Sequence, residues 1–514
     1  MNAEVELKLS AAGEDLEALA ERALRGKGSA RRPKRLVSTY YDTPDRRLAS
    51  KGLSLRVREV DGAFVQTVKA EAPGLARAED EAAVGDQRPD LGRIGDAAMR
   101  SRIGAVFPEE LAPVSVTDIV RRTVLVEQRD DLGRTSAVEV ALDKGQLRAS
   151  GQTEAVAEVE LELKAGSPGA VFTMARAFVD AGATRLITRS KAARASDLAA
   201  GTAPPARRAA RVELDRELPI GEALGRVLDN CFQQWWANHE AAFDGRNPEG
   251  VHQLRVAVRR LRSVLAVFGP LLAPSRLTWL KDEARAVMGA LGQARDLDVF
   301  DTELLPPLLN VRPNDGALGR LRAVAADARA EAYEAVRTNL ASARYTTFFL
   351  GFGDWVEARG WHADADAPTR AALGLPLAGF AGGVLEKRAK VVRKRGKRFA
   401  DLPIETRHEV RKDLKKLRYA ADFFRDLYDG ERTKPYLKRL ATLQDAFGHA
   451  NDVAVAETLL HGLGATDDDH RLAEARGLVL GWYGHASTDT ERELLKGWRA
   501  FSDATPFWRE PSPC

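Results

Sequence analysis

Charged and aliphatic side chains alternate along two segments that lie far apart in the sequence. In EVELKL (residues 4–9) and AEVELELK (157–164), every second residue is charged and the residues between are aliphatic. On a β-strand this spacing places the charges on one face and the aliphatic side chains on the other. The charged face is either a solvated surface or the wall of a polar cavity that holds a divalent cation, because hard cations take oxygen ligands. The charged positions are Glu4, Glu6, Lys8, Glu158, Glu160, Glu162 and Lys164.

Basic side chains on the segments between these two favour the cavity. Arg56 and Arg58 alternate with aliphatic residues, Lys69 ends the next strand pattern, and Arg121–Arg122 open another. Such a cluster of cations is stable when a polyanion lies among it. Carboxylates and cations on the inner wall of one barrel would together hold a metal–polyphosphate complex. Further alternating patterns fit either the cavity wall or outer salt bridges: Arg77, Glu79 and Glu81, and Glu139 with Asp143.

The elements that would carry these residues divide the chain into two domains. Strand patterns separated by turn formers such as Asp61-Gly62 fill residues 1–203, with helices expected at 13–25 and 168–182. Many short antiparallel strands with few helices indicate a barrel or a sandwich. Residues 204–218 are expected to be a linker, and residues 219–510 an all-α domain.

The helical domain repeats itself. Residues 251–268 align with 407–424, and 291–299 align with 447–455 at the same offset, which indicates an internal duplication into two related helical bundles. One face of each repeated helix is basic, and a stripe of arginines repels itself unless an anion compensates. A third basic stretch spans 385–399. Aromatic residues near the stripes fit the apolar faces better than stacking platforms for bases, so a backbone-only polyanion is favoured over nucleic acid.

The ordered motifs of the first domain resemble the CYTH, or triphosphate tunnel metalloenzyme, family. They are Glu4-x-Glu6-x-Lys8, STYYDTP (38–44), LSLRVRE (53–59), QTVK (66–69), RAEDE (77–81), VALDKG (140–145), EVELELK (158–164) and SKAAR (190–194). The resemblance implies an eight-stranded antiparallel β tunnel with covering helices that hydrolyses triphosphates with Mg²⁺ or Mn²⁺. It implies metal ligands at Glu4, Glu6, Glu158, Glu160 and Glu162, and catalytic roles for Glu4, Glu6, Lys8 and Glu160. It implies substrate binding by Lys8, Arg56, Arg58, Lys69, Arg122 and Lys191.

The repeated helices resemble the CHAD family, the conserved-histidine α-helical domain. This resemblance covers about 219–500 and implies that paired four-helix bundles bind inorganic polyphosphate. His239 and four other histidines carry no spacing signal and are expected to be ordinary surface or core residues. The polyphosphate-binding residues implied are His252, Arg255, Arg259, Arg262, Lys387, Lys394, His408, Arg411, Lys412, Lys415 and Arg418.

Together the two resemblances imply an α+β two-domain enzyme. It would hydrolyse inorganic triphosphate to pyrophosphate and phosphate in the tunnel, coupled to polyphosphate binding by the helical domain. One alternative is a non-catalytic polyphosphate-binding or granule-associated module. The other is a tunnel phosphohydrolase acting on nucleoside, thiamine or RNA 5′-triphosphates, or an adenylate cyclase.

Composition bears on the cellular location of the protein. Cys231 and Cys514 lie too far apart in sequence to suggest a disulfide framework, and no apolar run approaches the roughly 20 residues of a membrane span. The chain starts directly with a charged strand pattern, so no signal peptide is expected. We therefore expect a cytoplasmic protein, with association with polyphosphate granules as one option, and no membrane partner.

Overall fold

The computed structural model of the chain describes residues 4–11, 15–60, 62–70, 76–129, 133–463 and 469–509. Within these ranges, the side chains of residues 4, 76–77, 448–456 and 485–490 are not described. Glu4 is therefore placed by its backbone alone.

The strands of the first part form one antiparallel sheet in the order β10-β1-β6-β5-β4-β3-β7-β8-β9, with β2 paired to β7. Two of the strands, β2 and β10, have only two and three residues. The strands are β1 (Glu4–Ser10), β2 (Ser29–Ala30), β3 (Lys34–Asp42), β4 (Leu53–Val60), β5 (Ala63–Ala70), β6 (Ala76–Val84), β7 (Ala112–Arg129), β8 (Thr135–Ala149), β9 (Gln152–Ala165) and β10 (Arg185–Ile187).

Strand β1 joins the two acidic segments. Its first residues pair with β6 and its last residues with β10, while its other edge pairs with β9. In this register Glu6 lies opposite Glu162 and Lys8 lies opposite Glu160. The two charged strands are thus direct neighbours, and a lysine faces a glutamate across the ladder. The antiparallel sheet is confirmed, and the eight-stranded tunnel stays a prediction.

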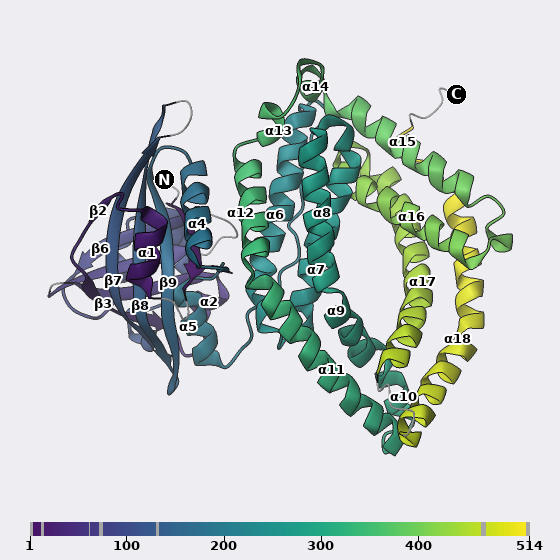
Figure 1. The fold of residues 1–514 in the computed structure, drawn as a ribbon, viewed down its shortest axis with the longest axis horizontal. Helices are drawn as coiled ribbons and strands as arrows, with labels where there is room; N and C mark the ends of the chain where they lie inside the picture. Colours follow the sequence, from purple (N-terminus) through teal and green to yellow (C-terminus); the bar gives the residue numbers. More distant parts are fainter. Residues whose placement is uncertain are drawn as a thin grey trace. The chain divides into compact units, whose positions relative to one another are not determined.

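The aliphatic face of the strands is covered by helices, as expected. Helix α4 (Gly169–Ala181) lies against β1, β8 and β9, and α1 (Leu16–Leu24) packs beside it (Figure 1). Val140 of β8, Leu161 of β9 and Phe178 of α4 are fully buried at this face. The predicted helices at 13–25 and 168–182 are confirmed. The remaining helices of this part are α2 (Arg47–Ser50), α3 (Ala97–Ile103) and α5 (Lys191–Ala200).

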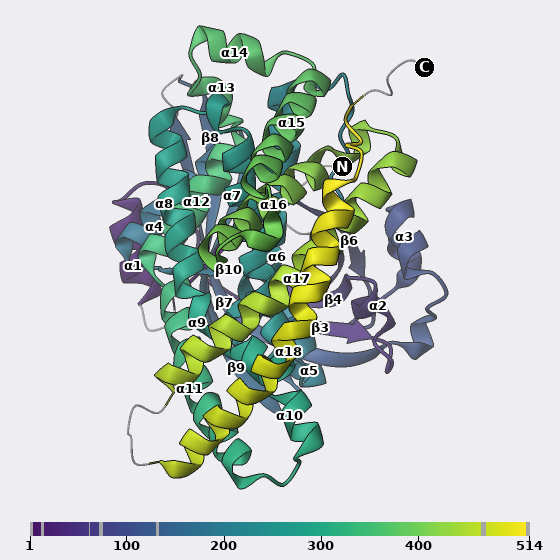
Figure 2. The ribbon, with the colours of Figure 1, turned by 90° about the vertical axis from the view of Figure 1, so that its right-hand side faces the viewer.

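The second part of the chain is helical, which confirms the all-α prediction. Among the described residues, no helix is both long enough and apolar enough to cross a membrane. The long helices α17 and α18 pack side by side (Figure 2). The helices are α6 (Ile220–Asp244), α7 (Pro248–Val267), α8 (Pro274–Ala290), α9 (Gly292–Val299), α10 (Pro306–Val311), α11 (Gly316–Leu340), α12 (Ala343–Glu357), α13 (Gly360–Ala363), α14 (Ala367–Leu373), α15 (Leu377–Arg395), α16 (Ile404–Phe424), α17 (Gly430–Gly462) and α18 (His470–Ser502).

Contacts within the chain group it into two compact units. Unit 1 comprises Met1–Arg208, Phe232–Leu254 and Arg337–Ala358, and unit 2 comprises the remainder. Parts of α6, α7 and α11 and the whole of α12 therefore pack with the sheet, although they belong to the helical part of the sequence. An aromatic cluster joins α6 and α12 inside unit 1, where Trp235 packs edge-on against Phe348 and Phe349.

His239 of α6 is fully buried in unit 1. This agrees with the expectation of an ordinary surface or core residue. Its Nε2 lies 3.1 Å from the carbonyl oxygen of Leu186, and its Nδ1 lies 3.0 Å from the hydroxyl of Tyr345. Burial lowers the pKa of His239 to about 4, so the ring is neutral at pH 7. A carbonyl oxygen can only accept, so Nε2 carries the proton and Nδ1 accepts from Tyr345. The Tyr345 oxygen in turn accepts a 2.8 Å hydrogen bond from the Trp235 indole.

Acid is expected to destabilise the protein through His239. Its pKa is about 4 when folded and about 6.5 when unfolded, so the unfolded state binds more protons between these values. The free energy of unfolding should therefore fall as the pH decreases from 6.5 to 4, by about 3 kcal/mol from this residue. Urea unfolding at several pH values should show a steeper loss for the wild type than for His239→Gln. Equal pH dependence in the two proteins would contradict this expectation.

Candidate active site

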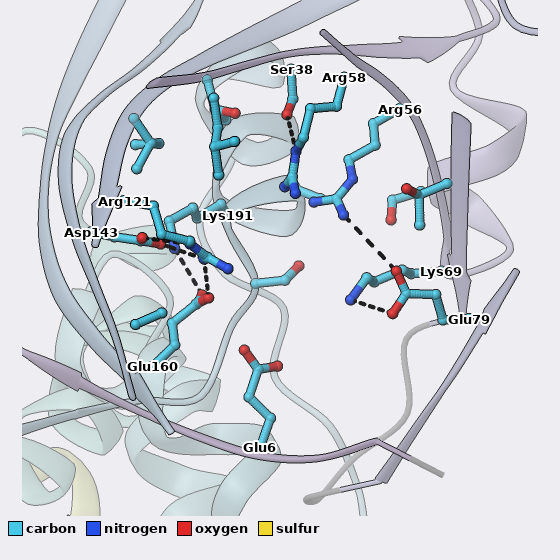
Figure 3. Close-up of a pocket in the computed structure, with 18 of the residues that line it drawn as sticks. Glu6, Ser38, Arg56, Arg58, Lys69, Glu79, Arg121, Asp143, Glu160 and Lys191 are labelled. Atoms are coloured by element: carbon cyan, nitrogen blue, oxygen red, sulfur yellow. Dashed lines mark hydrogen bonds and ion pairs between the residues drawn. The ribbon is translucent and has the colours of Figure 1, made fainter. Parts of the chain in front are cut away.

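A polar cavity of about 320 Å³ lies between the strands, and charged side chains of several strands point into it (Figure 3). Its lining combines seven acidic and seven basic side chains among the described residues. The acidic residues are Glu6, Glu79, Glu81, Glu139, Asp143, Glu160 and Glu162, and the basic residues are Lys8, Arg56, Arg58, Lys69, Arg121, Lys164 and Lys191. A cavity with this lining is suited to charged ligands of both signs.

Most of the site residues predicted from sequence meet in this cavity. The alternation of charged and aliphatic residues assigned their faces correctly because strand side chains have a period of two. Glu158 is buried beside the cavity, and the side chain of Glu4 lies outside the described part of the chain. The predicted residues that line the cavity are Glu6, Lys8, Arg56, Arg58, Lys69, Glu160, Glu162 and Lys191.

Arg122 is the predicted residue that the structure places elsewhere. It forms an ion pair with Glu17 of α1, while its neighbour Arg121 faces the cavity. Adjacent residues of a strand point to opposite faces. The sequence held a signal for the correct choice, because Val124 and Val126 share the face of Arg122 and are buried with the aliphatic residues.

Three carboxylates from two neighbouring strands converge at one wall. One oxygen atom each from Asp143, Glu158 and Glu160 lies within 4.8 Å of the others, and all three residues are buried. Asp143 on β8 lies directly opposite Glu158 on β9. Oxygen donors at this spacing can hold a divalent cation. Asp143 was left open between cavity wall and outer salt bridge by the sequence, and the structure places it on the wall.

Two cations lie among these carboxylates (Figure 3). The Nζ of Lys191, the first residue of α5, is 2.7 Å from Asp143 and 2.8 Å from Glu160, and it also pairs with Glu158. Arg121 donates two hydrogen bonds to Asp143, of 2.7 and 2.6 Å, and pairs with Glu160. Burial alone would raise the pKa of Glu160, but these cations and Lys8 outweigh it and hold the pKa well below its usual value. Glu160 is therefore charged at neutral pH.

The opposite side of the cavity is dominated by arginines. Arg58 donates a 3.0 Å hydrogen bond to the hydroxyl of Ser38 and has no ion pair among the described residues. Burial and the neighbouring charge of Arg56 lower the pKa of Arg58 to about 10. The Nε of Arg56 is buried without a hydrogen-bond partner in the described chain. Arg58 thus has no compensating ion pair and Arg56 has only long ones, at 3.9 and 4.0 Å from Glu79 and Glu81, so an anion between the two guanidinium groups would supply charge and acceptors.

The remaining charges of the cavity are paired in part. Lys69 lies 2.8 Å from Glu79, and Arg56 lies 3.9 Å from the same carboxylate. Lys8 bonds Glu6 at 2.6 Å. The structure thus places Glu79 and Glu81 on the cavity wall, which the sequence had left open.

The predicted polyphosphate residues of the helical part fall into two groups. Within unit 2, Arg259 of α7 donates a hydrogen bond to the hydroxyl of Tyr419 of α16, so the two repeated helices are in contact at these residues. Arg255 is half-buried, bonds the Met288 carbonyl at 3.0 Å, and has a pKa lowered by burial despite the charge of Asp296. Arg411, Lys415, Arg418 and His252 are also partly buried, whereas Arg262, Lys387, Lys394, His408 and Lys412 are exposed.

Comparison with known proteins matches both parts of the chain. Residues 2–196 match the CYTH domain and residues 226–461 match the CHAD domain. An inorganic triphosphatase of Haemophilus influenzae is 28% identical over 141 residues, which are 26% of this chain and 37% of that relative. The aligned region is thus little more than a third of the relative's length. The crystal structure of the CHAD domain from the plant Ricinus communis is 31% identical, with 58% of this chain and 97% of that chain covered and a TM-score of 0.50.

Proposed function

Because the chain belongs to the CYTH family over residues 2–196 and to the CHAD family over residues 226–461, we propose that it is a metal-dependent triphosphatase with a polyphosphate-binding domain. The reaction is the hydrolysis of inorganic triphosphate to pyrophosphate and phosphate in the cavity, with the strands as the walls of a tunnel. The observation that carries the proposal is a buried carboxylate cluster that faces two arginines, of which Arg58 forms no ion pair among the described residues and Arg56 has a buried Nε without a hydrogen-bond partner.

The carboxylate cluster fits a divalent cation. Asp143, Glu158 and Glu160 offer three buried oxygen donors, and cationic side chains already lie among them in the structure. We assign these three residues, with Glu6 nearby, as the residues that would hold Mg²⁺ or Mn²⁺, and Glu4 and Glu162 remain candidates from the resemblance. When bound, the metal would neutralise charge on the phosphate oxygens and lower the pKa of a water.

The side chains of the chain itself supply positioning and charge. Arg56 and Arg58 bind the phosphate oxygens on one side of the cavity, and Lys8, Lys69 and Lys191 reach them from the others. Arg121 keeps Asp143 and Glu160 in place through its paired hydrogen bonds. Phosphoryl transfer depends mainly on such positioning and charge stabilisation, so the site requires no covalent nucleophile.

The size and lining of the cavity favour an inorganic substrate over a nucleotide. A volume of about 320 Å³ is at the lower end of ligand pockets. Tyr40 is the one aromatic residue among the described residues that line it, so a nucleobase would find little surface for stacking. A short linear polyanion needs only the cations.

Phosphate release from inorganic triphosphate tests this function. We expect release in the presence of Mg²⁺ or Mn²⁺, with pyrophosphate as the second product, and no release after EDTA treatment. ATP, thiamine triphosphate and RNA with a 5′-triphosphate should be slower substrates, and faster hydrolysis of any of them would replace inorganic triphosphate as the substrate. Absence of release from every substrate with either metal would leave a non-catalytic binding protein.

For the helical domain, we propose that the basic faces of α7 and α16 bind polyphosphate through Arg255, Arg259 and the other predicted residues. The hydrogen bond and the cation–π contact between Arg259 and Tyr419 join α7 to α16 and support a shared surface. In the same preparation, Arg259→Met should weaken polyphosphate binding, while Arg322→Met, which removes an exposed charge from α11, should not. RNA at equal phosphate concentration should compete weakly, and equal competition would favour a general polyanion surface.

A further inference from the structure

The short strand β10 lies beside β1 and ends four residues before the cavity residue Lys191. Leu186 and Ile187 pair with Leu9 and Lys8 of β1. Successive residues of a strand direct their backbone groups to opposite edges, so the second edge of β10 needs other partners. In the described chain these partners are side chains of helices, and no further strand lies there.

Three backbone groups on this second edge bond to α6 and α12. The carbonyl of Thr184 accepts from the Thr346 hydroxyl, and the carbonyl of Leu186 accepts from His239. The Thr188 N–H donates to Glu240 at 3.1 Å. Residues 184, 186 and 188 alternate along the strand, as expected if all three direct these groups away from β1. Side chains of α6 and α12 thus form the hydrogen bonds that a neighbouring strand would form with this edge of β10.

Glu240 is the centre of this arrangement. Its second oxygen accepts a 3.0 Å hydrogen bond from Arg185, whose guanidinium lies 4.4 Å from the centre of the Phe243 ring. The Glu240 side chain is only 12% exposed. Burial alone would raise the pKa of Glu240, but the charge of Arg185 and the hydrogen bond from the Thr188 N–H outweigh it and lower the pKa, so the carboxylate stays charged. One carboxylate therefore fixes both a side chain and a backbone group of the β10 segment.

The segment after Thr188 carries this restraint into the cavity. Arg189 pairs with Asp197, and the hydroxyl of Ser190 accepts from the Ala193 N–H, which caps α5. Lys191 follows at once, and its ammonium group lies among the carboxylates of the cavity. Only Arg189 and Ser190 separate Thr188, which Glu240 binds, from Lys191, and each of the two forms an ion pair or a hydrogen bond of its own.

We propose that Glu240 is a positioning residue for the cavity. Together with His239 and Thr346 it holds β10, and β10 in turn sets the position of Lys191. The helix that holds it begins the CHAD-family part of the sequence, so this part completes the site of the CYTH part. The inference rests on the proposed triphosphatase function for its kinetic readout. All of the residues involved belong to unit 1.

Glu240→Ala and a matched control test the proposal in the full-length protein. The control is Asp354→Ala, which removes the 3.0 Å ion pair between α12 and Arg176 of α4 and leaves β10 untouched. We expect Glu240→Ala to lower kcat for triphosphate about tenfold, with a smaller change in KM, and Asp354→Ala to leave kcat unchanged. Glu240→Gln, which keeps an acceptor for the Thr188 N–H, should recover part of the loss.

Hydrogen–deuterium exchange gives a readout that does not depend on activity. Peptides covering residues 184–195 should exchange faster in Glu240→Ala than in the wild type, and at wild-type rates in Asp354→Ala. Unchanged exchange in Glu240→Ala, or faster exchange with unchanged kcat, would overturn the proposal. If the wild type hydrolyses no triphosphate, the proposed function fails, and Mn²⁺ affinity is measured in place of kcat. An affinity altered in Glu240→Ala but not in Asp354→Ala would then support the positioning role of Glu240, and an unaltered affinity would overturn it.

Discussion

Glu160→Gln should lower kcat for inorganic triphosphate about 100-fold or more, at every pH in the neutral range. The substitution keeps the shape of the side chain and removes its charge. Glu160 contributes an oxygen to the carboxylate cluster and contacts Lys8, Arg121 and Lys191. Its pKa lies well below the ordinary value, so no pH change within the neutral range will mimic the loss. Steady-state kinetics with saturating Mg²⁺ and Mn²⁺ measure the effect.

Glu162→Gln provides the comparison for this prediction. Glu162 lies two residues further along β9, pairs with Lys164 at 2.6 Å, and stands outside the group of three carboxylates. We expect its substitution to cost about tenfold or less. Mn²⁺ binding should be lost in Glu160→Gln and retained in Glu162→Gln. Equal losses in the two variants would show that Glu162 contributes to metal binding as much as Glu160, and would contradict the assignment of the metal to the group of three carboxylates.

Period-two alternation explains why so much of the cavity could be predicted from the sequence. Aliphatic residues must face the helices, so Arg56, Arg58 and Glu160 had to face the other way. At Arg122 the predicted face was wrong, because Arg122 shares its strand face with the buried aliphatic residues Val124 and Val126. For Asp143 the pattern gave the face but no reason to prefer a cavity over solvent, because that choice depends on which strands come to lie opposite.

The contribution of the helical sequence to unit 1 could not be predicted. Residues 232–254 and 337–358 have helical periodicity like their surroundings, and no local pattern tells a helix which neighbour it will pack on. The aromatic run around Phe348 and Phe349 marks a buried helix, but not its partner. Likewise, β10 has three residues, and its partners Glu240 and His239 lie about fifty positions away. Such long-range packing is set by the tertiary fold.

The position of Lys191 leads to the second large effect, which concerns metal affinity as well as catalysis. Its ammonium group lies among Asp143, Glu158 and Glu160, where a divalent cation would also have to lie. Burial disfavours the charge of Lys191, but the three carboxylates outweigh this and raise its pKa. The lysine therefore competes for the site as a cation whenever no metal is bound, and must move aside when one enters.

Lys191→Met should consequently bind Mn²⁺ more tightly than the wild type in the absence of substrate, by about tenfold or more. The same variant should lose about 100-fold in kcat/KM for triphosphate, because the displaced ammonium group is proposed to bind phosphate. Lys69→Met removes one charge from the same cavity but from a lysine paired with Glu79, 2.8 Å away, so its Mn²⁺ affinity should change less than threefold. Calorimetric titration with Mn²⁺ compares the three proteins. If Lys191→Met binds Mn²⁺ no more tightly than Lys69→Met, then Lys191 does not compete with the metal. The metal would in that case bind outside the carboxylate cluster, or the protein would not bind it.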